Sequence, residues 1–571
     1  MALFRQLKAG IVTSALDDSK FIPLDVLNRT ITVESITQSL GPASKLWAYC
    51  WSDQLPRQIH QDAKKVFSIL VLIGNVPAIH RLLSNGLTDK DLPLFRKDVT
   101  DVLISKTTHK EFAVFESWDP VKLDAFLEKQ WLVQAPVIEW VGQNLELDDK
   151  CPLPLVEKGE KVGGGNGVWV HQARVHPAHR SAAFAAATDG LLAIKEIADR
   201  ETFLTERQNL DNMQAFPHQN LIKPLGTIER GSLFYVIFPW AHGGDLRQLW
   251  ERQDSSSDSR KYIKWSLEQM LGLVGGIKLL HGNNIRHGDI KPQNVLHFID
   301  PGDPNAIADP GDPLTPRLGS LVLADVGVSK RHVLATHVRH WATTTNAVTI
   351  SYEAPEAEYD RHNGIPRSRK YDQWSLGCMF LEFTVWLLYG FQAVEVFRRR
   401  RTSSREDPTT APGNFFTQQS YGSVSIHSRV SRAIKHLRDD PRCGKGTALG
   451  DLLTLVETRL LQIKPDQRAD ATTLYATLEG ILTKALEDRD YLSKNLEKTP
   501  EVPKFFSKRS RRGSSSSQSS AWSSADTRGS RSSFSSTSSG FSNRTSRSSF
   551  SSDGIARVPE EALVEDGGES G

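Results

Sequence analysis

The sequence contains little cysteine, with only four in 571 residues. The four lie far apart in the chain, at Cys50, Cys151, Cys378 and Cys443. Disulfide scaffolds of small secreted domains and cysteine-based zinc sites bring their cysteines together at short, recognisable spacings. The sequence therefore argues against both classes, and a reducing intracellular setting fits its composition best.

Long apolar runs and a large charge imbalance are also missing. The longest apolar run, Val66–Ile79, contains Gly74 and Pro77 and is too short to cross a bilayer. Lys plus Arg number 70 and Asp plus Glu number 67, so the formal net charge is only +3. This balance argues against a dedicated nucleic-acid or membrane-surface protein. Because the first residues also lack a convincing signal peptide, we expect an intracellular protein, cytoplasmic or nuclear, with no membrane span.

Composition divides the chain into three regions. In residues 1–150, apolar residues recur near helical spacing in Gln61–Leu83 and Ser117–Trp131, which predicts a mainly α-helical region. Residues 155–486 begin with β-branched stretches bounded by glycine and become helical later. Residues 503–571 are dominated by serine, and such a segment buries too little apolar surface to offset its ordering entropy. We expect this tail to be disordered.

A run of four arginines opens the segment Arg398–Gly413. Consecutive like charges are usually found on solvated surface, so we interpret this segment as an exposed loop rather than a binding patch.

The first segment that carries chemistry is HGDIKPQN, His287–Asn294. Phosphoryl transfer to a hydroxyl needs a carboxylate to accept the proton, a cation beside the moving phosphoryl group, and an oxygen ligand for magnesium. Asp289, Lys291 and Asn294 supply these three groups on one loop. Alone, the spacing could also arise in an ordinary surface turn.

A second segment is LVLADVGV, Leu321–Val328, an apolar strand that ends at Asp325. The end of a strand holds a carboxylate rigidly, and a carboxylate is a preferred ligand of magnesium. An aspartate in a strand-to-loop turn is common. The motif indicates a metal ligand only because Asp325 follows Asp289 at a plausible separation in the sequence, with a strand between them.

A third segment is VGGGNGVWV, Val162–Val170, followed by LLAIKEI, Leu191–Ile197. Glycine lets backbone N–H groups approach phosphates closely, and the second strand would aim the ammonium of Lys195 at the same phosphates. Downstream, Glu206 lies in a helical pattern and is the best partner for Lys195, with Glu201 as a close rival.

Three further segments complete the pattern, namely YEAPEAEY, YDQWSLGCMFLE and IKPDQRADA, at Tyr352–Tyr359, Tyr371–Glu382 and Ile463–Ala471. In this order the segments resemble the eukaryotic protein-kinase family, Ser/Thr type, and the flanking phrases are similar to fungal proteins with a helical N-terminal region. The resemblance covers residues 155–486. It implies an α+β, bilobal fold with a small β-rich lobe (155–240) and a large α-helical lobe (241–486).

The resemblance also implies a role for each matching residue. Asp289 would be the catalytic base, Lys291 would contact the γ-phosphate, and Glu206 would pair with Lys195. Asn294 and Asp325 would hold Mg²⁺. Glu356 and Arg468 would form the ion pair that anchors the activation segment. The ATP contacts would come from Gly163, Gly165, Val170, Lys195, Phe238 and Trp240.

Some positions depart from the family pattern. Val168 stands at the third glycine position, and roughly ten extra residues precede Lys195. Gly288 replaces the arginine that reads a phosphate on the activation segment, although Arg286 could partly substitute. Val326 replaces the phenylalanine after the magnesium-binding aspartate. None of these changes removes a residue that does chemistry.

The leading hypothesis is an ATP- and Mg²⁺-dependent protein kinase acting on Ser or Thr of a protein substrate. Lys291 and Thr349 lie where Ser/Thr-directed kinases place a lysine and a threonine. The alternative is a pseudokinase or scaffold that binds ATP without turnover and binds protein partners through the N-terminal helices and the kinase fold. For either function, residues 1–150 and the tail are the expected sites for further protein partners. A small-molecule phosphotransferase is disfavoured, because such enzymes usually lack the Ala-Pro-Glu and Asp-x-Trp-Ser-x-Gly elements found here.

Overall fold

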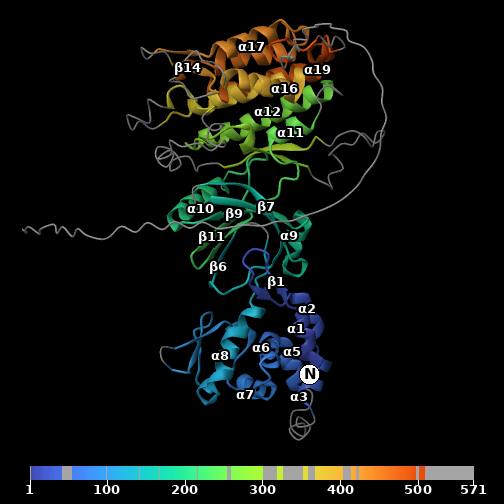
Figure 1. Cartoon of the computed structure of the whole chain (residues 1–571), viewed down its shortest axis with the longest axis vertical. Helices are drawn as coiled ribbons and strands as arrows, with labels where there is room; N and C mark the ends of the chain where they lie inside the picture. The colour runs from blue at the N-terminus through green and yellow to red at the C-terminus, as the bar shows by residue number, and fades with distance from the viewer. Residues whose placement is uncertain are drawn as a thin grey trace, which may run out of the picture. The chain divides into compact units, whose positions relative to one another are not determined.

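The computed structural model describes most of the chain as far as Ser507. The described ranges are 2–41, 54–97, 100–139, 142–165, 168–214, 216–253, 259–299, 318–325, 351–357, 367–402, 413–418, 423–496 and 501–507. Along the chain they form an N-terminal helical region, a lobe built on a six-stranded sheet, and a larger helical lobe (Figure 1). This confirms the predicted α+β, bilobal fold class.

Helices dominate the N-terminal region, as predicted, and two small sheets accompany them. The helices are α1 (Ala2–Ala9), α2 (Leu24–Thr30), α3 (Val33–Leu40), α5 (Gln54–Asp62), α6 (Lys64–Leu72), α7 (Ile79–Ser84) and α8 (Pro120–Lys129). The strands are β1 (Val12–Thr13) with β2 (Lys20–Phe21), and β3 (Leu94–Arg96), β4 (Leu103–Ser105) and β5 (Glu111–Phe112).

Helix α6 forms the centre of this region. All side chains from Val66 to Val71 are buried, as expected of a helix that is apolar on every face. The predicted helical stretch Gln61–Leu83 is interrupted after α6, because Gly74 adopts a φ of 68° and Pro77 lacks a backbone donor. The chain then turns back, and α7 covers the same core.

The sheet of the small lobe begins before the expected boundary at residue 155. Its strand order is β6-β10-β11-β9-β8-β7, and β6 (Gln143–Leu147) pairs in parallel with β10 (Gly226–Arg230). The remaining strands are antiparallel: β7 (Leu155–Gly165), β8 (Val168–Val175), β9 (Leu191–Ile197) and β11 (Leu233–Pro239). Residues of the N-terminal region therefore supply one edge of this sheet.

The extra residues before Lys195 have a structural use. They form a 3-10 turn (Pro177–His179) and the short helix α9 (Ala182–Ala187), whose Phe184 is fully buried. Phe184 packs with Leu192 and Ile194 of β9 in one apolar cluster. Since side chains alternate along a strand, this cluster covers the face of the sheet opposite to Lys195.

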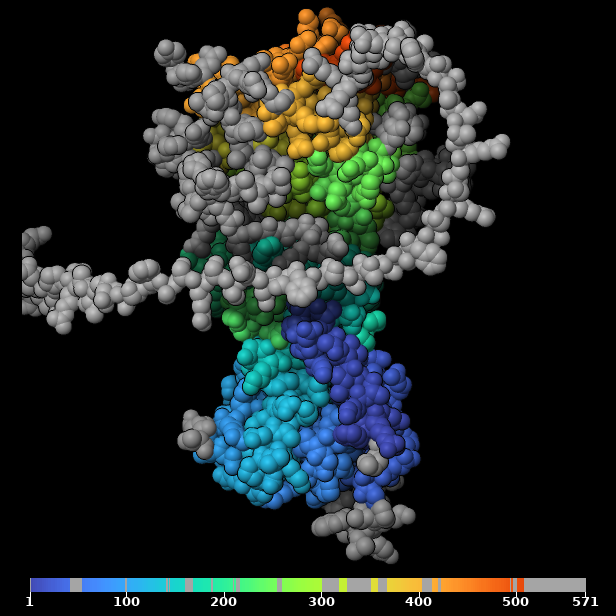
Figure 2. Space-filling model, in the orientation of Figure 1, coloured from blue at the N-terminus to red at the C-terminus, as the bar shows by residue number. Residues whose placement is uncertain are grey.

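His179 joins the N-terminal region to this cover. Its Nε2 accepts a hydrogen bond from the Leu24 N–H (3.2 Å), and its Nδ1 lies 2.9 Å from the Pro136 carbonyl oxygen. The N–H of Ala15 also donates to the Leu155 carbonyl (2.7 Å). In Figure 2 the dark-blue surface of the first residues adjoins the teal surface of the small lobe.

The large lobe is mostly helical. Its helices are α11 (Leu246–Arg252), α12 (Ser259–Gly282), α16 (Lys370–Thr402), α17 (Ser428–Arg438), α18 (Ala448–Leu455), α19 (Ala471–Glu487) and α20 (Arg489–Ser493). Short antiparallel pairs accompany them, namely β12 (Val295–Phe298) with β13 (Ser320–Leu323), and β14 (Phe416–Gln418) with β15 (Val424–Ile426).

Helix α16 is the core of this lobe. Its length and apolar composition would suffice to cross a bilayer, but 83% of its most apolar window is buried inside the protein. Trp374 and Trp386 are fully buried in it, and Gly390 breaks the helix with a φ of 73°. Among the described residues no other helix meets the same length and composition test.

The segment Arg398–Gly413 was expected to be a solvated loop, and this is wrong for its first residues. Arg398 to Arg401 belong to the end of α16, and Arg401 is buried. The Arg401 guanidinium lies 2.6 Å from Glu382 and about equally close to the rings of Phe397 and Phe415, at 4.1 and 4.0 Å. A buried carboxylate and two aromatic faces stabilise this charge in place of water. Residues 403–412 lie outside the described ranges.

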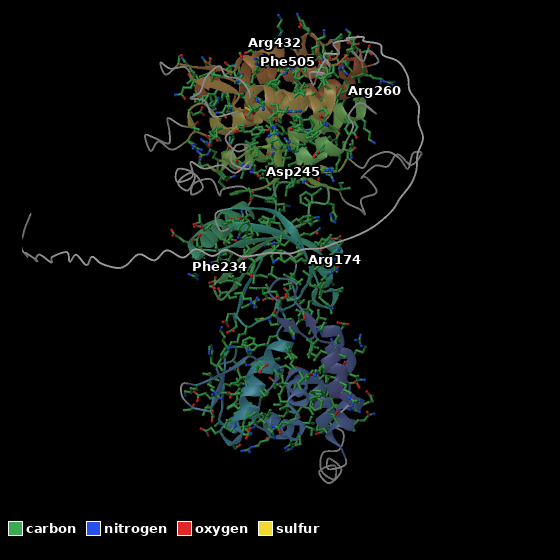
Figure 3. All side chains as sticks on the ribbon, viewed as in Figure 1. Arg174, Phe234, Asp245, Arg260, Arg432 and Phe505 are labelled. Atoms are coloured by element: carbon green, nitrogen blue, oxygen red, sulfur yellow. The ribbon has the colours of Figure 1, made fainter. Side chains whose placement is uncertain are left out.

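The expectation of a disordered tail from residue 503 is also wrong at its start. Phe505 and Phe506 are buried, and Phe506 stacks on Tyr389 of α16 with 5.1 Å between ring centroids. Phe505 stacks on His436 of α17 (5.2 Å), close to Arg432 (Figure 3). Residues 508–571 lie outside the described ranges.

Phe506→Ala should destabilise the large lobe. Removal of a fully buried phenylalanine typically costs about 3–5 kcal/mol of unfolding free energy. Chemical denaturation monitored by tryptophan fluorescence would measure the loss. Val502→Ala, at a side chain that is 43% exposed, is the matched control and should change stability by less than about 0.5 kcal/mol. Equal stability of the two variants would contradict the packing role of Phe506.

Acid should weaken the junction at His179. Burial lowers the pKa of this imidazole, and the charges of His176 and Lys65 lower it further. The hydrogen bond to the Pro136 carbonyl and the charge of Asp25 act on the pKa in the opposite direction but do not outweigh them. Since the folded-state pKa lies below the unfolded value of about 6.5, the stability from the neutral ring is complete above that pH and decreases below it. Urea unfolding at about pH 7.5 and 5.5 should show a smaller pH dependence in His179→Gln than in the wild type. An identical pH dependence in both proteins would contradict this.

Candidate active site

Lys195 lies at the centre of the site, on a middle strand of the sheet. Its backbone is in register with Val170 of β8 and Val236 of β11. The ammonium is buried and contacts two carboxylates, at 2.7 Å from Glu206 and 3.2 Å from Asp325. Burying an ammonium is unfavourable unless it is paired, so these two contacts allow Lys195 to lie inside the sheet.

Glu206 reaches Lys195 from helix α10 (Arg200–Gln214). The helix is fixed to the sheet by Phe203, which stacks on Phe234 of β11 with 5.0 Å between ring centroids. Glu201, the rival candidate, lies in the first turn of the helix and is exposed. The structure therefore places Glu206, rather than Glu201, against Lys195.

Asp325 comes from the large lobe, just after β13. It adopts a φ of 59°, a left-handed conformation that is unusual for a residue with a side chain. Such local strain persists where surrounding contacts hold it, often at functional sites. Here the contact is the ion pair to Lys195. Val326, Gly327 and Thr349, three other positions of the predicted pattern, lie outside the described residues.

Charge pairing determines the protonation of this pair. The positive charge of Lys195 lowers the pKa of Asp325 and keeps the carboxylate ionised. Burial alone would lower the pKa of Lys195, but Asp325 and Glu206 together raise it above its ordinary value. Both groups are therefore charged at neutral pH.

The predicted catalytic residues form one hydrogen-bonded group. Lys291 Nζ lies 2.7 Å from Asp289 Oδ2, and Asn294 Nδ2 donates to the same oxygen at 2.9 Å. Asn294 Nδ2 also donates to the Asp289 backbone carbonyl (2.8 Å). These contacts fix the orientation of the Asp289 carboxylate, which remains partly exposed.

The β12–β13 pair brings Asn294 close to Asp325. Asn294 directly precedes β12, whose Val295 is opposite Leu323 of β13. The Ala324 N–H donates to the Asn294 carbonyl (2.8 Å), and Asp325 is the next residue. This antiparallel register explains why Asn294 and Asp325, which are far apart in sequence, lie at the same end of the β12–β13 pair.

Asp372 supports the catalytic loop, a role that sequence reasoning missed. Its carboxylate accepts hydrogen bonds from the backbone N–H groups of His287 (2.9 Å) and Gly288 (2.8 Å), and contacts His281 Nε2 (2.8 Å). Gly288 has a φ of 81°, a conformation that a side chain would strain. The sequence signal that could have indicated this role is a charged residue, Asp372, at the start of a strongly apolar segment that forms the buried helix α16.

The remaining predicted nucleotide contacts lie on neighbouring strands. Gly163 and Gly165 are near the end of β7, in register with Val170 and Val168 of β8. Phe238 is opposite Ala193 of β9, and Trp240 follows the end of β11. The backbones of Gly163, Val170 and Lys195 therefore lie on consecutive strands, and Phe238 and Trp240 follow at the far end of β11.

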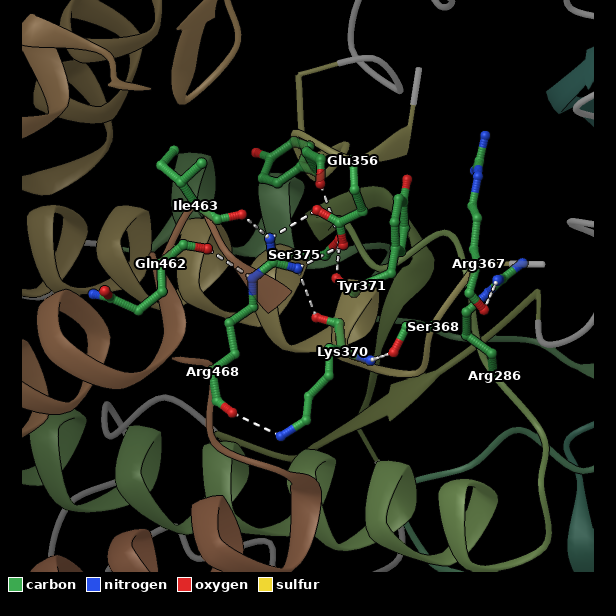
Figure 4. A network of polar contacts seen from close by, with 11 residues as sticks. Arg286, Glu356, Arg367, Ser368, Lys370, Tyr371, Ser375, Gln462, Ile463 and Arg468 are labelled. Carbon is green, nitrogen blue, oxygen red and sulfur yellow. Dashed lines mark hydrogen bonds and ion pairs between the residues drawn. The ribbon is translucent and has the colours of Figure 1, made fainter. Parts of the chain in front are cut away.

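Glu356 and Arg468 form the predicted ion pair. Two parallel hydrogen bonds of 2.7 Å join them, from Nη1 to Oε1 and from Nη2 to Oε2 (Figure 4). Arg468 is fully buried and also donates to the backbone carbonyls of Gln462, Ile463 and Lys370. This saturated guanidinium ties the segment around Glu356 to the large lobe.

The chemistry of the two proposed metal ligands fits magnesium. Asp325 has a carboxylate that is 52% exposed, and Asn294 uses its amide nitrogen toward Asp289 and retains an amide oxygen. Magnesium prefers such hard oxygen ligands and completes its shell with phosphate oxygens and water. Within the described ranges, no group of three or more His, Cys, Asp or Glu side chains forms a metal cage, so phosphates would have to complete the site.

Comparisons with known proteins agree with the two-lobed fold. A family model described as protein kinase domain matches residues 156–437. A calcium/calmodulin-dependent protein kinase of Metarhizium anisopliae is 28% identical over 206 residues, which are 35% of this chain and 45% of the relative. Mitogen-activated protein kinase kinase kinase 6 of Homo sapiens is 27% identical over 250 residues, 43% of this chain and 16% of the relative.

The chain spans less than half the length of these two relatives. Residues 156–437, which match the family model, include Lys195, Asp289 and Asp325. This part of the chain is a protein kinase domain of the eukaryotic superfamily.

Proposed function

We propose that the protein is an ATP-dependent protein serine/threonine kinase. The observation that carries the proposal is the meeting of Lys195 and Glu206 from the small lobe with Asp325 from the large lobe. Because this contact is made while Asp289 is held by Lys291 and Asn294, the groups needed for phosphoryl transfer are oriented together. Catalysis of this kind depends mainly on positioning and electrostatics.

Each residue has a proposed role. Lys195, oriented by Glu206, would bind the α- and β-phosphates of ATP. Asp325 and Asn294 would hold Mg²⁺, which when bound neutralises charge on the phosphates. Asp289 would orient the acceptor hydroxyl and take its proton, and Lys291 would contact the γ-phosphate. Gly163, Gly165, Val170, Phe238 and Trp240 would enclose the nucleotide.

Serine and threonine are the proposed acceptors because of the loop sequence. The catalytic loop reads Asp-x-Lys-Pro-x-Asn, with Lys291 two residues after Asp289. In the structure this lysine contacts the catalytic carboxylate directly (2.7 Å). The protein substrate itself, and an intracellular location in cytoplasm or nucleus, remain part of the proposal.

A scaffold or pseudokinase is the second candidate. The replacement of the loop arginine by Gly288 and the altered glycine-rich hairpin favour it. In this function protein partners would bind through residues 1–150 and the tail. Against it, pseudokinases usually lose a chemical residue, whereas Lys195, Asp289, Asn294 and Asp325 are all present. Their mutual contacts favour the enzyme.

Asp289→Asn should abolish most phosphoryl transfer. Removal of a positioned general base typically costs about 10²–10⁴-fold in rate. The assay is Mg²⁺-dependent transfer of labelled phosphate from ATP to a generic protein substrate. Asp439→Asn, at an exposed aspartate beyond α17, is the matched control and should retain wild-type activity. Equal activity of Asp289→Asn and the wild type would refute the assignment, and no activity in any variant would favour the scaffold.

Lys195→Met should weaken nucleotide binding. It removes the cation proposed to contact the phosphates and leaves the buried Glu206 without its partner, so affinity for Mg·ATP should decrease at least about tenfold. Titration calorimetry with a non-hydrolysable ATP analogue would measure this. Asp289→Asn should bind the analogue within about twofold of the wild type, since Asp289 is proposed to act on the acceptor. Unchanged binding by Lys195→Met would contradict the nucleotide role of Lys195.

A further inference from the structure

Two arginines share one aromatic ring beside the catalytic loop. Arg286 directly precedes His287, and Arg367 lies shortly before α16. Their guanidinium carbons are 5.8 and 5.3 Å from the centroid of the Tyr371 ring. Arg286 Nη1 donates to the backbone carbonyl of Arg367 (2.7 Å). In Figure 4 both side chains extend away from the Arg468–Glu356 network.

The guanidinium of Arg367 differs from that of Arg468 in its hydrogen bonding. Arg468 donates to a carboxylate and to backbone carbonyls through all three nitrogens. The Nη2 atom of Arg367 is buried and has no hydrogen-bond partner among the described residues. A buried donor without a partner typically costs about 1–3 kcal/mol, more for a charged group. The site therefore favours an incoming acceptor.

Charges of both signs lie near the Tyr371 ring. Two guanidinium groups contact the ring, and they repel each other because both carry a full positive charge. Burial raises the pKa of Tyr371, and the charges of Glu353, Asp289 and Asp372 raise it further against the opposing charge of Arg367. Asp289 is paired with Lys291, and Asp372 contacts His281 and the backbone N–H groups of His287 and Gly288.

The arginine pair is close to the point where an acceptor would react. Arg286 is three residues before Asp289 in sequence, so their Cα atoms are at most about 11 Å apart. The Asp289 charge also acts on the Tyr371 ring that both arginines contact. A peptide with its hydroxyl at Asp289 would therefore have neighbouring residues within reach of this pair.

We propose that Arg286 and Arg367 bind an oxyanion, a carboxylate or a phosphate, carried by the protein substrate near its acceptor hydroxyl. The proposal rests on the proposed kinase function and specifies its substrate class as acidic or already phosphorylated segments. Guanidinium groups suit this ligand, because their planar fork of donors matches the oxygens of both anions. The pair acts in binding and selection, and transfers no proton.

The test compares acceptor peptides that differ in one charge. A neutral peptide with a single serine is the reference, and aspartate or phosphoserine replaces each flanking residue in turn. At one or more positions the wild type should show a kcat/KM at least about tenfold above that of the neutral peptide, as expected for a charge-assisted, bidentate contact. No preference at any position would overturn the proposal.

Variants then assign the preference to the arginine pair. Arg367→Gln should lose about tenfold on the favoured anionic peptide and stay within about twofold on the neutral peptide. Arg367→Lys keeps the charge but loses the planar fork of donors, so its kcat/KM on the anionic peptide should lie between those of Arg367→Gln and the wild type. Arg260→Gln, at an exposed arginine at the start of α12 (Figure 3), is the control and should match the wild type. Equal losses on both peptides would mean a structural role and overturn the proposal.

A binding measurement separates this site from catalysis. Fluorescence anisotropy of the labelled anionic peptide, with the Asp289→Asn protein, should show binding that Arg367→Gln weakens about tenfold. If transfer is never detected but this difference is found, the anion site stands and the kinase proposal fails. If transfer is detected but no anionic peptide is preferred, the kinase proposal stands and the anion-site proposal fails. Inorganic phosphate that binds through Arg367 while the peptides show no preference would also overturn the substrate assignment.

Discussion

One buried ammonium organises the whole site. Lys195 lies inside the sheet only because two carboxylates neutralise it, and these come from different parts of the chain. Glu206 requires helix α10 to pack on the sheet, and Asp325 requires the large lobe to lie against the small one. Loss of both partners would leave the buried ammonium without compensation, a penalty typically of about 3–5 kcal/mol. The same ion pairs therefore orient the two lobes relative to each other and position the charged side chains of the site.

Contacts within short motifs could be predicted from the sequence, and so could some that join motifs in a fixed order. Asp289, Lys291 and Asn294 lie within six residues, and their hydrogen bonds follow from that spacing. The bidentate Glu356–Arg468 pair spans more than a hundred residues, yet it was predicted because both ends stand in recognisable segments. In each case the signal was the combination of residue type and order, which a single residue does not carry.

Other contacts had no local signal. Arg401 looks like one of four equivalent surface charges, and only the packed α16 shows that Glu382, Phe397 and Phe415 enclose it. Phe505 and Phe506 stand at the start of a serine-rich segment, and their burial depends on contacts with Tyr389 of α16 and His436 of α17. Local composition predicts average exposure, whereas tertiary packing decides individual residues.

The edge strand β6 has a practical consequence for defining the catalytic part of this chain. A fragment cut at Leu155 would keep every motif of the family but would leave the hydrogen-bonding edge of β10 open. It would also strip Ile138 and Leu153 from the cluster that shields Leu192 and Ile194. Open edges and bare apolar faces promote aggregation. The smallest autonomous piece of this protein is therefore larger than its recognisable motifs.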